Sequence, residues 1–501
     1  MPPIRIRDAD TTSDRRPTAK YRRENTKSES TYHFLSSPFA DIDDKSTSVE
    51  LSTCSRASGH PSELSRSPTV FSESSLTAAG SSDDTKTEVV PPAPPFTEPI
   101  TVCGIELHPT VAFDTFWRFA AERKAIDDRR RAGKSPPFTE DSVLRDYFFC
   151  NTYRVLDKVC QYLIKEVIEK GSQDPEEVVF RVLLFNSYTK IDTWELLVRE
   201  LGPLKWSTYD QEKYRKVLSA AANSGMTLYT GAFIKPAPHF GSDQNHVNHL
   251  YLIETFMEDQ LYSRLLAAPY LADVYEHIVS FPSMGPFSTY QLMLCLSYTE
   301  VLNFHPNDLV ISGPGSISGL NKLFGKSMDK GRRNVEDFEA EVMRYLTTSQ
   351  EYHFKRLGLE FSGLGPERLP MTVADIEHTL CEVDKYCRIA HPHLKGKRTN
   401  LYRVFRPLGA RAPSEAFLPK AWSHPARRTP NIRPEKTLVV DKRYLIESLK
   451  DHRDSPKGRQ FLVYWVGYPP SDASWEHESS LLQDAPLAVA EYLRDHGLDS
   501  C

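Results

Sequence analysis

The stretch 461–470, FLVYWVGYPP, gathers aromatic residues whose faces can hold a positive charge. Alternating apolar residues predict a strand here, which would turn some of these rings toward a core. The alternation ends at 465–468, WVGY, where two rings bracket a glycine. Rings at such a place are either core side chains or the walls of a cation site, because aromatic quadrupoles attract easily desolvated cations.

The surrounding segment resembles a chromodomain, the histone-reading module of the heterochromatin-protein family and of some retroelement integrases. The resemblance rests on two strands around a turn at DSPKGR, the W-x-G-Y pattern at 465–468, the Trp475-Glu476 pair and a last helix with Val489, Tyr492 and Leu493 on one face. It implies a small domain at 438–497 with a three-stranded antiparallel sheet and a C-terminal helix.

The resemblance also implies a methyl-lysine site. A methylated lysine keeps its charge but loses strong hydrogen bonding, and each ring contact with it is worth about 0.5–2 kcal/mol. The three rings of the family's cage fall on Tyr444, Trp465 and Tyr468. Asp472 stands where a family acid helps to hold the ammonium, and Trp475 matches a structural tryptophan that we expect in the core. The implied partner is a methylated histone tail.

Two positions depart from the family pattern and leave the histone site open. Val466 stands where the family often has Lys, and Ser480 stands where an Asn usually helps to pin the peptide backbone. The alternative for the rings is a purely structural role in the core, as for most strand aromatics.

Helical periodicity dominates from about residue 106 to 422, and strand-like alternation is scarce there. Apolar residues recur at three- and four-residue steps in 151–171 and 175–202. Asp174 is a plausible N-cap before the second run, and Gly202 ends it. The same pattern recurs in 246–268 and 373–390. We therefore expect one large, all-α domain at 106–422.

Two turns in this region could grip phosphate. Residues 277–296, HIVSFPSMGPFSTYQLMLCL, have the form of a helix–hairpin–helix, in which turn N–H groups and a helix N-terminus bind phosphate. Ser283 replaces the first glycine of the usual L-P-G-h-G turn, and an ordinary interhelical turn is the alternative. The candidate DNA contacts here are Pro282, Gly285 and Ser288.

The second turn, Gly313-Pro314-Gly315, demands an unusual backbone ahead of a helix, and Gly313 and Gly315 are further candidate DNA contacts. The following GLNKLFGKS only approximates a phosphate-binding P-loop. Five residues rather than four separate Gly319 from Gly325, and no apolar strand precedes them. We expect no nucleotide kinase site here.

Several separated motifs together resemble one family. They are FDTFWRFAAERKAIDDRR, NTYRVLDKVCQYLI, YTKIDTWELL, FPSMGPFSTYQL, SGPGSISGL and LCEVDKYCR. The family is the helical domain of 5-hydroxymethyluracil DNA kinases, also called α-glutamyl/putrescinyl thymine pyrophosphorylase-like, and it looks related to helix–hairpin–helix DNA glycosylases. The resemblance spans about 110–422 and implies a role with modified thymine bases in DNA. The kinases' P-loop domain has no counterpart here, so phosphorylation is not implied.

The glycosylase relatives have a catalytic carboxylate after the second hairpin helix, and Asp308 falls in that zone. A carboxylate there could stabilise a cationic sugar or activate a nucleophile, with a turn or capping acid as the alternative. Glu382, Asp384 and Lys385 form a second charged cluster. Glu382 and Lys385 share a helix face, for which an ion pair is the simpler interpretation.

Arg118, Arg123 and Arg154 lie in the family motifs and are candidates for phosphate contact, with salt bridging as the alternative. Tyr290 or Trp194 could stack on an extruded base, although both are more often core residues.

We expect no metal and no cofactor, because neither cluster of histidines and cysteines has a typical metal-site spacing. The first cluster is His239, His246 and His249, and the second is Cys381, Cys387, His391 and His393.

Residues 1–98 hold 30 Ser or Thr and no sustained periodicity, so we expect a disordered Ser/Thr/Pro-rich tail. Its basic cluster at 15–23 is a nuclear import signal, a contact for nucleic acid or a merely solvated segment. A basic linker at 423–437 overlaps the stretch 395–436, which has eleven Lys or Arg against two acids, a net of +9. It suits phosphate contact or serves only as a solubilising spacer.

No apolar run approaches membrane-spanning length and no secretory signal opens the chain, so we expect no membrane partner. Eight cysteines without a C-x-x-C pair indicate reduced thiols in an intracellular protein.

The sequence thus predicts a nuclear, mainly α, chromatin-associated protein that binds methylated histone tails and DNA, including DNA with modified thymine, within chromatin complexes. It leaves open whether the helical domain is an enzyme. A non-catalytic chromatin adaptor and a domesticated mobile-element product are the alternatives.

Overall fold

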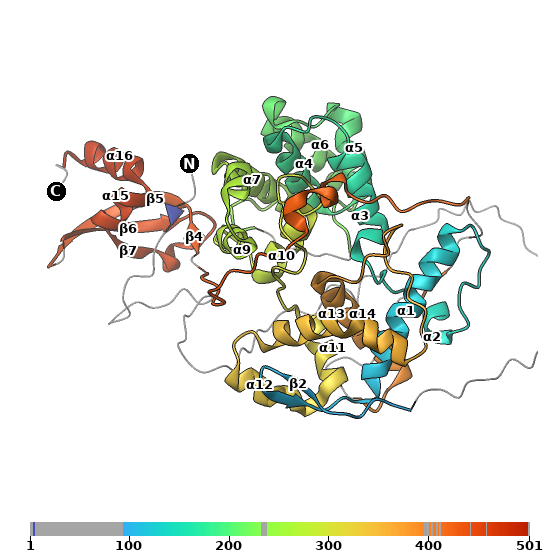
Figure 1. Cartoon of the computed structure of the whole chain (residues 1–501). Helices are drawn as coiled ribbons and strands as arrows, with labels where there is room; N and C mark the ends of the chain where they lie inside the picture. Colours follow the sequence, from blue (N-terminus) through green and yellow to red (C-terminus); the bar gives the residue numbers. More distant parts are fainter. Residues whose placement is uncertain are drawn as a thin grey trace, which may run out of the picture.

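The computed structural model describes residues 4–5, 94–231, 238–394, 396, 400–401, 404–406, 409, 412–440, 442–456 and 458–498. A large helical domain is followed by a small module that contains a sheet (Figure 1), which confirms the predicted mainly α fold class. Each part has its own hydrophobic core. Apart from 4–5 and 94–98, the predicted disordered tail at 1–98 lies outside the described residues. No helix among the described residues is long and apolar enough to span a bilayer.

The helical domain begins earlier than the sequence predicts. The ring of Phe96 stacks on that of Phe113 at a centroid distance of 5.4 Å. The backbone N–H of Phe96 donates to Asp114 Oδ2 at 3.0 Å. The strands β2 (Ile100–Val102) and β3 (Ile105–Leu107) then form an antiparallel hairpin. Residues 94–98 therefore belong to the domain rather than to the tail, because Phe96 is an apolar anchor.

The helices form two groups, one around α4 and one around α14 (Figure 1). In chain order they are α1 (Val111–Arg131), α2 (Ser142–Asp146), α3 (Lys158–Tyr162), α4 (Pro175–Tyr188), α5 (Ile191–Leu201), α6 (Gln211–Asn223), α7 (Asn245–Glu258), α8 (Leu261–Ala267), α9 (Leu271–Val279), α10 (Pro286–Leu296), α11 (Pro314–Phe324), α12 (Met328–Asn334), α13 (Phe338–Arg356) and α14 (Val373–Ala390). The first group includes α7 and α10, and the second includes α1, α11 and α13.

Helix boundaries follow local capping chemistry. The carboxylate of Asp174 accepts the N–H of Glu176, which confirms the predicted cap of α4. The predicted run 175–202 is nevertheless two helices, because Thr189 adopts a left-handed backbone with φ of 48° and ends the hydrogen-bond ladder. Gln260, at φ of 54°, divides α7 from α8 in the same way.

The close packing of α11 on α14 depends on glycine. A Cβ atom at Gly319 would lie 2.4 Å from the carbonyl oxygen of Leu380, and one at Gly315 would lie 2.6 Å from Cys381 Sγ. Gly313 is the buried N-cap of α11. Helix packing thus gives Gly313 and Gly315 a structural role, and their contact with DNA stays a prediction.

A buried histidine makes the helical domain sensitive to acid. The ring of His353 stacks on Trp117 at 5.1 Å, and neither ring nitrogen has a hydrogen-bond partner among the described residues. Burial, with help from the Arg356 cation, lowers the pKa of His353 to about 4. The unfolded chain keeps a pKa of about 6.5. The contribution of neutral His353 to the free energy of unfolding is therefore complete above pH 6.5. It is lost as the pH falls from 6.5 toward 4.

We expect His353→Phe to raise the free energy of unfolding by about 1–2 kcal/mol at pH 7, because it removes buried polar atoms that lack partners. The variant should also lose less stability than the wild type between pH 6.5 and 4.5. Urea denaturation of both chains at the two pH values measures the difference. Equal losses in both chains would contradict the assignment.

The C-terminal module has the predicted sheet and helix. Its elements are β4 (Arg443–Tyr444), β5 (Ile446–Ser455), β6 (Gly458–Trp465), β7 (Ser474–His477), α15 (Glu478–Asp484) and α16 (Pro486–His496). The strands β5, β6 and β7 form an antiparallel sheet in that order. Alternate residues Phe461, Val463 and Trp465 of β6 are buried in one core with Val489 and Leu493 of α16.

Trp475 does not join this core, contrary to the prediction. Its ring is half-buried and lies under the guanidinium of Arg453, with 4.3 Å between Cζ and the ring centroid. Its neighbour Glu476 is 7% exposed and faces inward. Successive side chains of a strand point to opposite faces, so the inward Glu476 places Trp475 outside.

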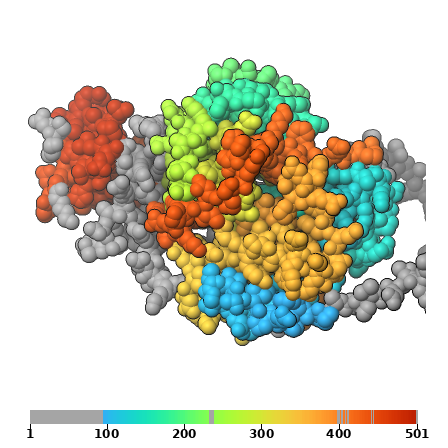
Figure 2. All heavy atoms as spheres, in the orientation of Figure 1, coloured from blue at the N-terminus to red at the C-terminus, as the bar shows by residue number. Residues whose placement is uncertain are grey.

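The predicted basic linker is bound to the helical domain. The segment 412–440 crosses the surface of that domain (Figure 2). Arg427 is 8% exposed and donates to the carbonyl oxygens of Thr299 and Leu302 at 3.1 and 2.5 Å. Arg433 pairs with Asp273 and Glu276 at 2.8 and 2.7 Å. These two arginines hold the chain in place and are engaged by the protein itself, whereas phosphate contact by the rest of the basic linker stays a prediction.

Candidate functional sites

The three predicted cage rings lie together beside β4. The ring centroid of Tyr444 is 5.9 Å from that of Trp465 and 6.0 Å from that of Tyr468. The planes are inclined by 59° and 70°, so Tyr444 meets both other rings at a steep angle. Aromatic faces arranged as a corner can contact one cation from several sides. Asp472 ends the 3-10 helix η7 (Pro470–Asp472) that follows Tyr468 and is half-buried.

Hydrogen bonds fix the Trp465 ring of the corner. Trp465 is 7% exposed, and its indole N–H donates to Ser474 Oγ at 3.0 Å. The hydroxyl of Ser474 in turn donates to Glu476 Oε1 at 2.7 Å. This chain sets the indole orientation, so that the ring serves both the core and the corner.

The glycine between the two rings has a structural reason. Gly467 adopts a φ of 78°, and a Cβ atom there would lie 2.5 Å from the carbonyl oxygen of His239. The His239 ring lies 5.7 Å from that of Tyr468. A cleft of about 560 Å³ runs along this contact. It is lined by Phe240, Gly241, Ser242, Tyr251, Glu447, Val466, Gly467 and Tyr468.

The edge of β4 accepts a further strand. The two-residue strand β1 (Ile4–Arg5) pairs with it in antiparallel register, with Ile4 opposite Tyr444 (Figure 1). A backbone ladder of this kind is how a sheet edge binds an extended peptide, with side-chain pockets giving specificity. The edge and the ring corner share Tyr444, so a peptide on this edge would run past the corner.

The turn between α9 and α10, which we predicted as the hairpin of a helix–hairpin–helix, is covered. Ser283 adopts a φ of 62°, the left-handed conformation that suits a glycine. Pro282 and Ser288 are buried and Gly285 is half-buried. The Lys442 ammonium, just before β4, donates to the hairpin's Met284 carbonyl oxygen. Pro282 and Ser288 are therefore not placed for direct contact with DNA, which corrects that part of the prediction.

The carboxylate of Asp308 is buried and bonded to the protein's own backbone. The residue is 5% exposed, and its two carboxylate oxygens accept the backbone N–H groups of His305 and Asn431 at 3.1 and 2.8 Å. Burial raises the pKa of Asp308. Because Asn431 belongs to the segment that crosses the domain, the carboxylate anchors this segment. The geometry favours the turn-acid alternative.

The other candidate acids separate into two places. Lys385 Nζ lies 2.7 Å from Glu382 Oε1, and Glu382 Oε2 accepts the N–H of Cys150 at 3.0 Å. Burial opposes both charges, but their mutual attraction outweighs it, so the pKa of Glu382 is lowered and that of Lys385 raised. Asp384 instead binds Ser318 and Arg388, each at 2.8 Å.

Only one of the three candidate arginines is exposed. Arg118 lies on the outer face of α1. Arg123 donates twice to the Phe149 carbonyl oxygen at 3.3 Å. Arg154 is 8% exposed and its guanidinium donates to Gln291 Oε1. Arg123 and Arg154 therefore hold the protein interior, whereas Arg118 is open to phosphate.

The candidate stacking residues are both buried. Trp194 is 6% exposed and packs on Phe185 at 5.9 Å. Tyr290 is 4% exposed, and its hydroxyl has no hydrogen-bond partner among the described residues. Neither ring stacks on a base without a rearrangement of the core.

Residues 110–396 match the model of a family described as "5-hmdU DNA kinase, helical domain", which covers more than half of the 501 residues. The chain belongs to this family. Residues 444–495 match the Chromo (CHRromatin Organisation MOdifier) domain. A 5-hmdU DNA kinase of Bacillus phage SP10 is 25% identical over 297 residues, which cover 55% of this chain and 44% of the phage protein. The chain thus spans less than half of that relative. No solved structure matches.

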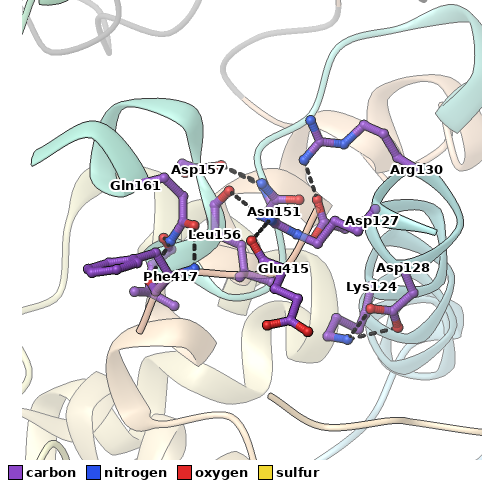
Figure 3. A network of polar contacts seen from close by, with 12 residues as sticks. Lys124, Asp127, Asp128, Arg130, Asn151, Leu156, Asp157, Gln161, Glu415 and Phe417 are labelled. Atoms are coloured by element: carbon purple, nitrogen blue, oxygen red, sulfur yellow. Dashed lines mark hydrogen bonds and ion pairs between the residues drawn. The ribbon is translucent and has the colours of Figure 1, made fainter. Parts of the chain in front are cut away.

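Residues from distant family motifs meet inside the helical domain of this chain. We call this cluster, which contains Asp127, Asn151, Asp157 and Glu382, the polar centre. Asp127 of α1 pairs with Arg130 and Arg131, each at 2.6 Å. Asn151 donates its backbone and side-chain N–H groups to Asp157 Oδ1 at 3.0 and 3.1 Å (Figure 3). Glu382 reaches the same loop from 232 positions away. The motifs at 151–164 and 380–388 are thus neighbours in space.

The centre also contains groups that the sequence did not single out. Cys150, Asp157 and His378 converge there. One weak signal was available, because His378 and Glu382 are four residues apart on α14 and so share a helix face. The histidines expected not to bind metal lie elsewhere. His246 contacts Ser219 Oγ at 2.8 Å, and His391 contacts Thr115 Oγ1 at 2.7 Å.

Proposed function

We propose that this protein binds a methylated lysine of a histone tail in the corner of Tyr444, Trp465 and Tyr468. The observation that carries the proposal is that these rings meet at the strand edge of β4, where a further strand already pairs. Asp472 adds the negative charge that favours an ammonium ligand. The chromodomain match supports a chromatin partner, and with it a nuclear location.

We propose further that the helical domain binds DNA and recognises a modified thymine. Support comes from its membership of a family named for a 5-hmdU DNA kinase and from the exposed Arg118. We take this domain as 94–422, the connecting segment as 423–437 and the chromodomain as 438–497. Two weak sites on one chain raise the overall avidity for chromatin that carries both marks.

The test uses the full chain and two kinds of ligand. Fluorescence anisotropy compares one histone-tail peptide in unmethylated and trimethylated forms, and then duplexes with thymine, 5-hydroxymethyluracil or 5-hydroxymethylcytosine. We expect preference for the trimethylated peptide and for the 5-hydroxymethyluracil duplex. Equal affinity for both peptide forms would refute the lysine proposal, and equal affinity for all duplexes would refute the base proposal.

A non-catalytic adaptor is the second candidate function. The observation that favours it is that both oxygens of Asp308 are occupied by backbone N–H groups. Digestion of the incubated duplexes, followed by mass spectrometry of the nucleosides, separates the two functions. Unchanged nucleosides with retained binding support the adaptor. A new or missing base that is unaffected by Asp308→Asn but lost in Glu382→Gln places an enzyme at the polar centre.

We expect that removal of residues 1–8 tightens binding of the trimethylated peptide by about 3- to 10-fold, because β1 occupies the edge that the peptide needs. Anisotropy on the two chains measures the change. Deletion of 51–58 serves as the control of equal length and should have no effect. A double Ile4→Pro, Arg5→Pro variant, which lacks the donors of the ladder, should behave like the first deletion. Unchanged affinity in both would exclude competition by β1.

A further inference from the structure

Three ligand-type side chains meet in the polar centre of the helical domain. The thiol of Cys150, a carboxylate oxygen of Asp157 and an imidazole nitrogen of His378 lie within 4.8 Å of one another. Cys150 and Asp157 come from the segment that contacts α14, and His378 comes from α14 itself. His378 is 4% exposed, and the other two are half-buried.

The histidine nitrogen in this group is unsatisfied. His378 Nε2 is buried and has no hydrogen-bond partner among the described residues. Its distance of 3.7 Å from Asp157 Oδ2 is too long for a hydrogen bond. Asn151 holds Asp157 through the other oxygen, Oδ1. Two oriented polar atoms therefore face each other without bonding, and a cation between them would satisfy both.

We propose that Cys150, Asp157 and His378 bind a Zn²⁺-class ion, with a fourth position left for water or a ligand. Thiolate, imidazole and carboxylate are the ligands that zinc takes in proteins, at about 2.0–2.3 Å. A tetrahedral ion at these lengths needs donor atoms about 3.5 Å apart, which small side-chain shifts provide from the present spacing. Binding converts the thiol to a thiolate and releases its proton to solvent.

The charges and neighbours of these three side chains favour a divalent cation. The thiolate and Asp157 carry two negative charges, which match the two charges of the ion. Glu382 is paired with Lys385 at 2.7 Å and accepts the N–H of Cys150 at 3.0 Å, so it positions the cysteine from outside the ligand set. Outer groups of this kind commonly orient metal ligands. The inference depends on neither of the ligands proposed above.

The test is made on the full chain, purified without an affinity tag that binds metal and dialysed against metal-free buffer. Elemental analysis should find about one zinc per chain. Replacement by Co²⁺ should give a thiolate-to-metal absorption band, which reports a cysteine ligand directly. Cys150→Ser and His378→Asn should each bind Zn²⁺ at least 10-fold more weakly, by competition with a chromogenic chelator.

Cys381→Ser is the matched control, because this cysteine lies on α14, in contact with Gly315 of α11, but outside the ligand group. It should retain the zinc and the cobalt band. The proposal is overturned if the wild type neither purifies with zinc nor binds it on titration, or if Cys150→Ser keeps full affinity. Circular dichroism shows whether each variant is folded. If a variant unfolds, the cobalt spectrum of the wild type still decides whether a thiolate binds the ion.

Discussion

The Trp465→Ala variant is expected to lose methyl-dependent peptide binding, with affinity for the trimethylated peptide falling by about 30-fold or more. The indole forms one wall of the corner, with its ring centroid 5.9 Å from that of Tyr444. A desolvated cation–ring contact is worth about 2 kcal/mol, which corresponds to about 30-fold. Anisotropy with the unmethylated and trimethylated peptides measures the effect. The ratio of the two affinities should approach one.

Trp475→Ala provides the matched control for this experiment. It removes the same side chain from the same sheet, but from the outer face under Arg453. We expect it to keep the preference for the methylated peptide. Trp465 also belongs to the core, so the variant must be shown to be folded by near-ultraviolet circular dichroism. Undiminished methyl preference in a folded Trp465→Ala chain would exclude the cage.

The Lys385→Ala variant is expected to destabilise the helical domain by about 3–5 kcal/mol, because it leaves a buried charge without its partner. Glu382 has a side chain 1% exposed, and its Oε1 atom lies 2.7 Å from Lys385 Nζ. The measurement is urea denaturation, followed through the transition of the helical domain, because the two domains need not unfold together. This measurement does not require the helical domain to have an enzymatic activity.

Two further variants test whether the lost stability of Lys385→Ala comes from the buried charge of Glu382. Arg215→Ala breaks the exposed pair with Glu212 on α6, where both side chains are nearly half exposed, and should cost less than about 1 kcal/mol. A double Glu382→Gln, Lys385→Met variant removes both charges and should lose less stability than Lys385→Ala. If Lys385→Ala and Arg215→Ala lose equal stability, the pair is not the buried element that the structure indicates.

Local patterns were sufficient for much of the fold. The cap at Asp174 and the last helix with Val489, Tyr492 and Leu493 on one face follow from short-range spacing, and the structure confirms them. The placement of Trp475 in the core was wrong, because it rested on the family resemblance, whereas strand alternation with the inward Glu476 turns Trp475 to the outer face. The run 175–202 failed because a single left-handed residue, Thr189, divides a continuous apolar pattern.

The sequence by itself determined the family, the mainly α class and the three aromatic rings that meet beside β4, because these depend on residue types at fixed, short spacing. The tertiary structure decided which of the charged candidates meet. It joined Glu382 and Lys385 to Cys150, Asp157 and His378, and it used Asp308 to anchor the segment that crosses the domain. Burial and long-range approach of distant segments decide whether a carboxylate is a ligand, an ion pair or an anchor, and no local spacing carries that information.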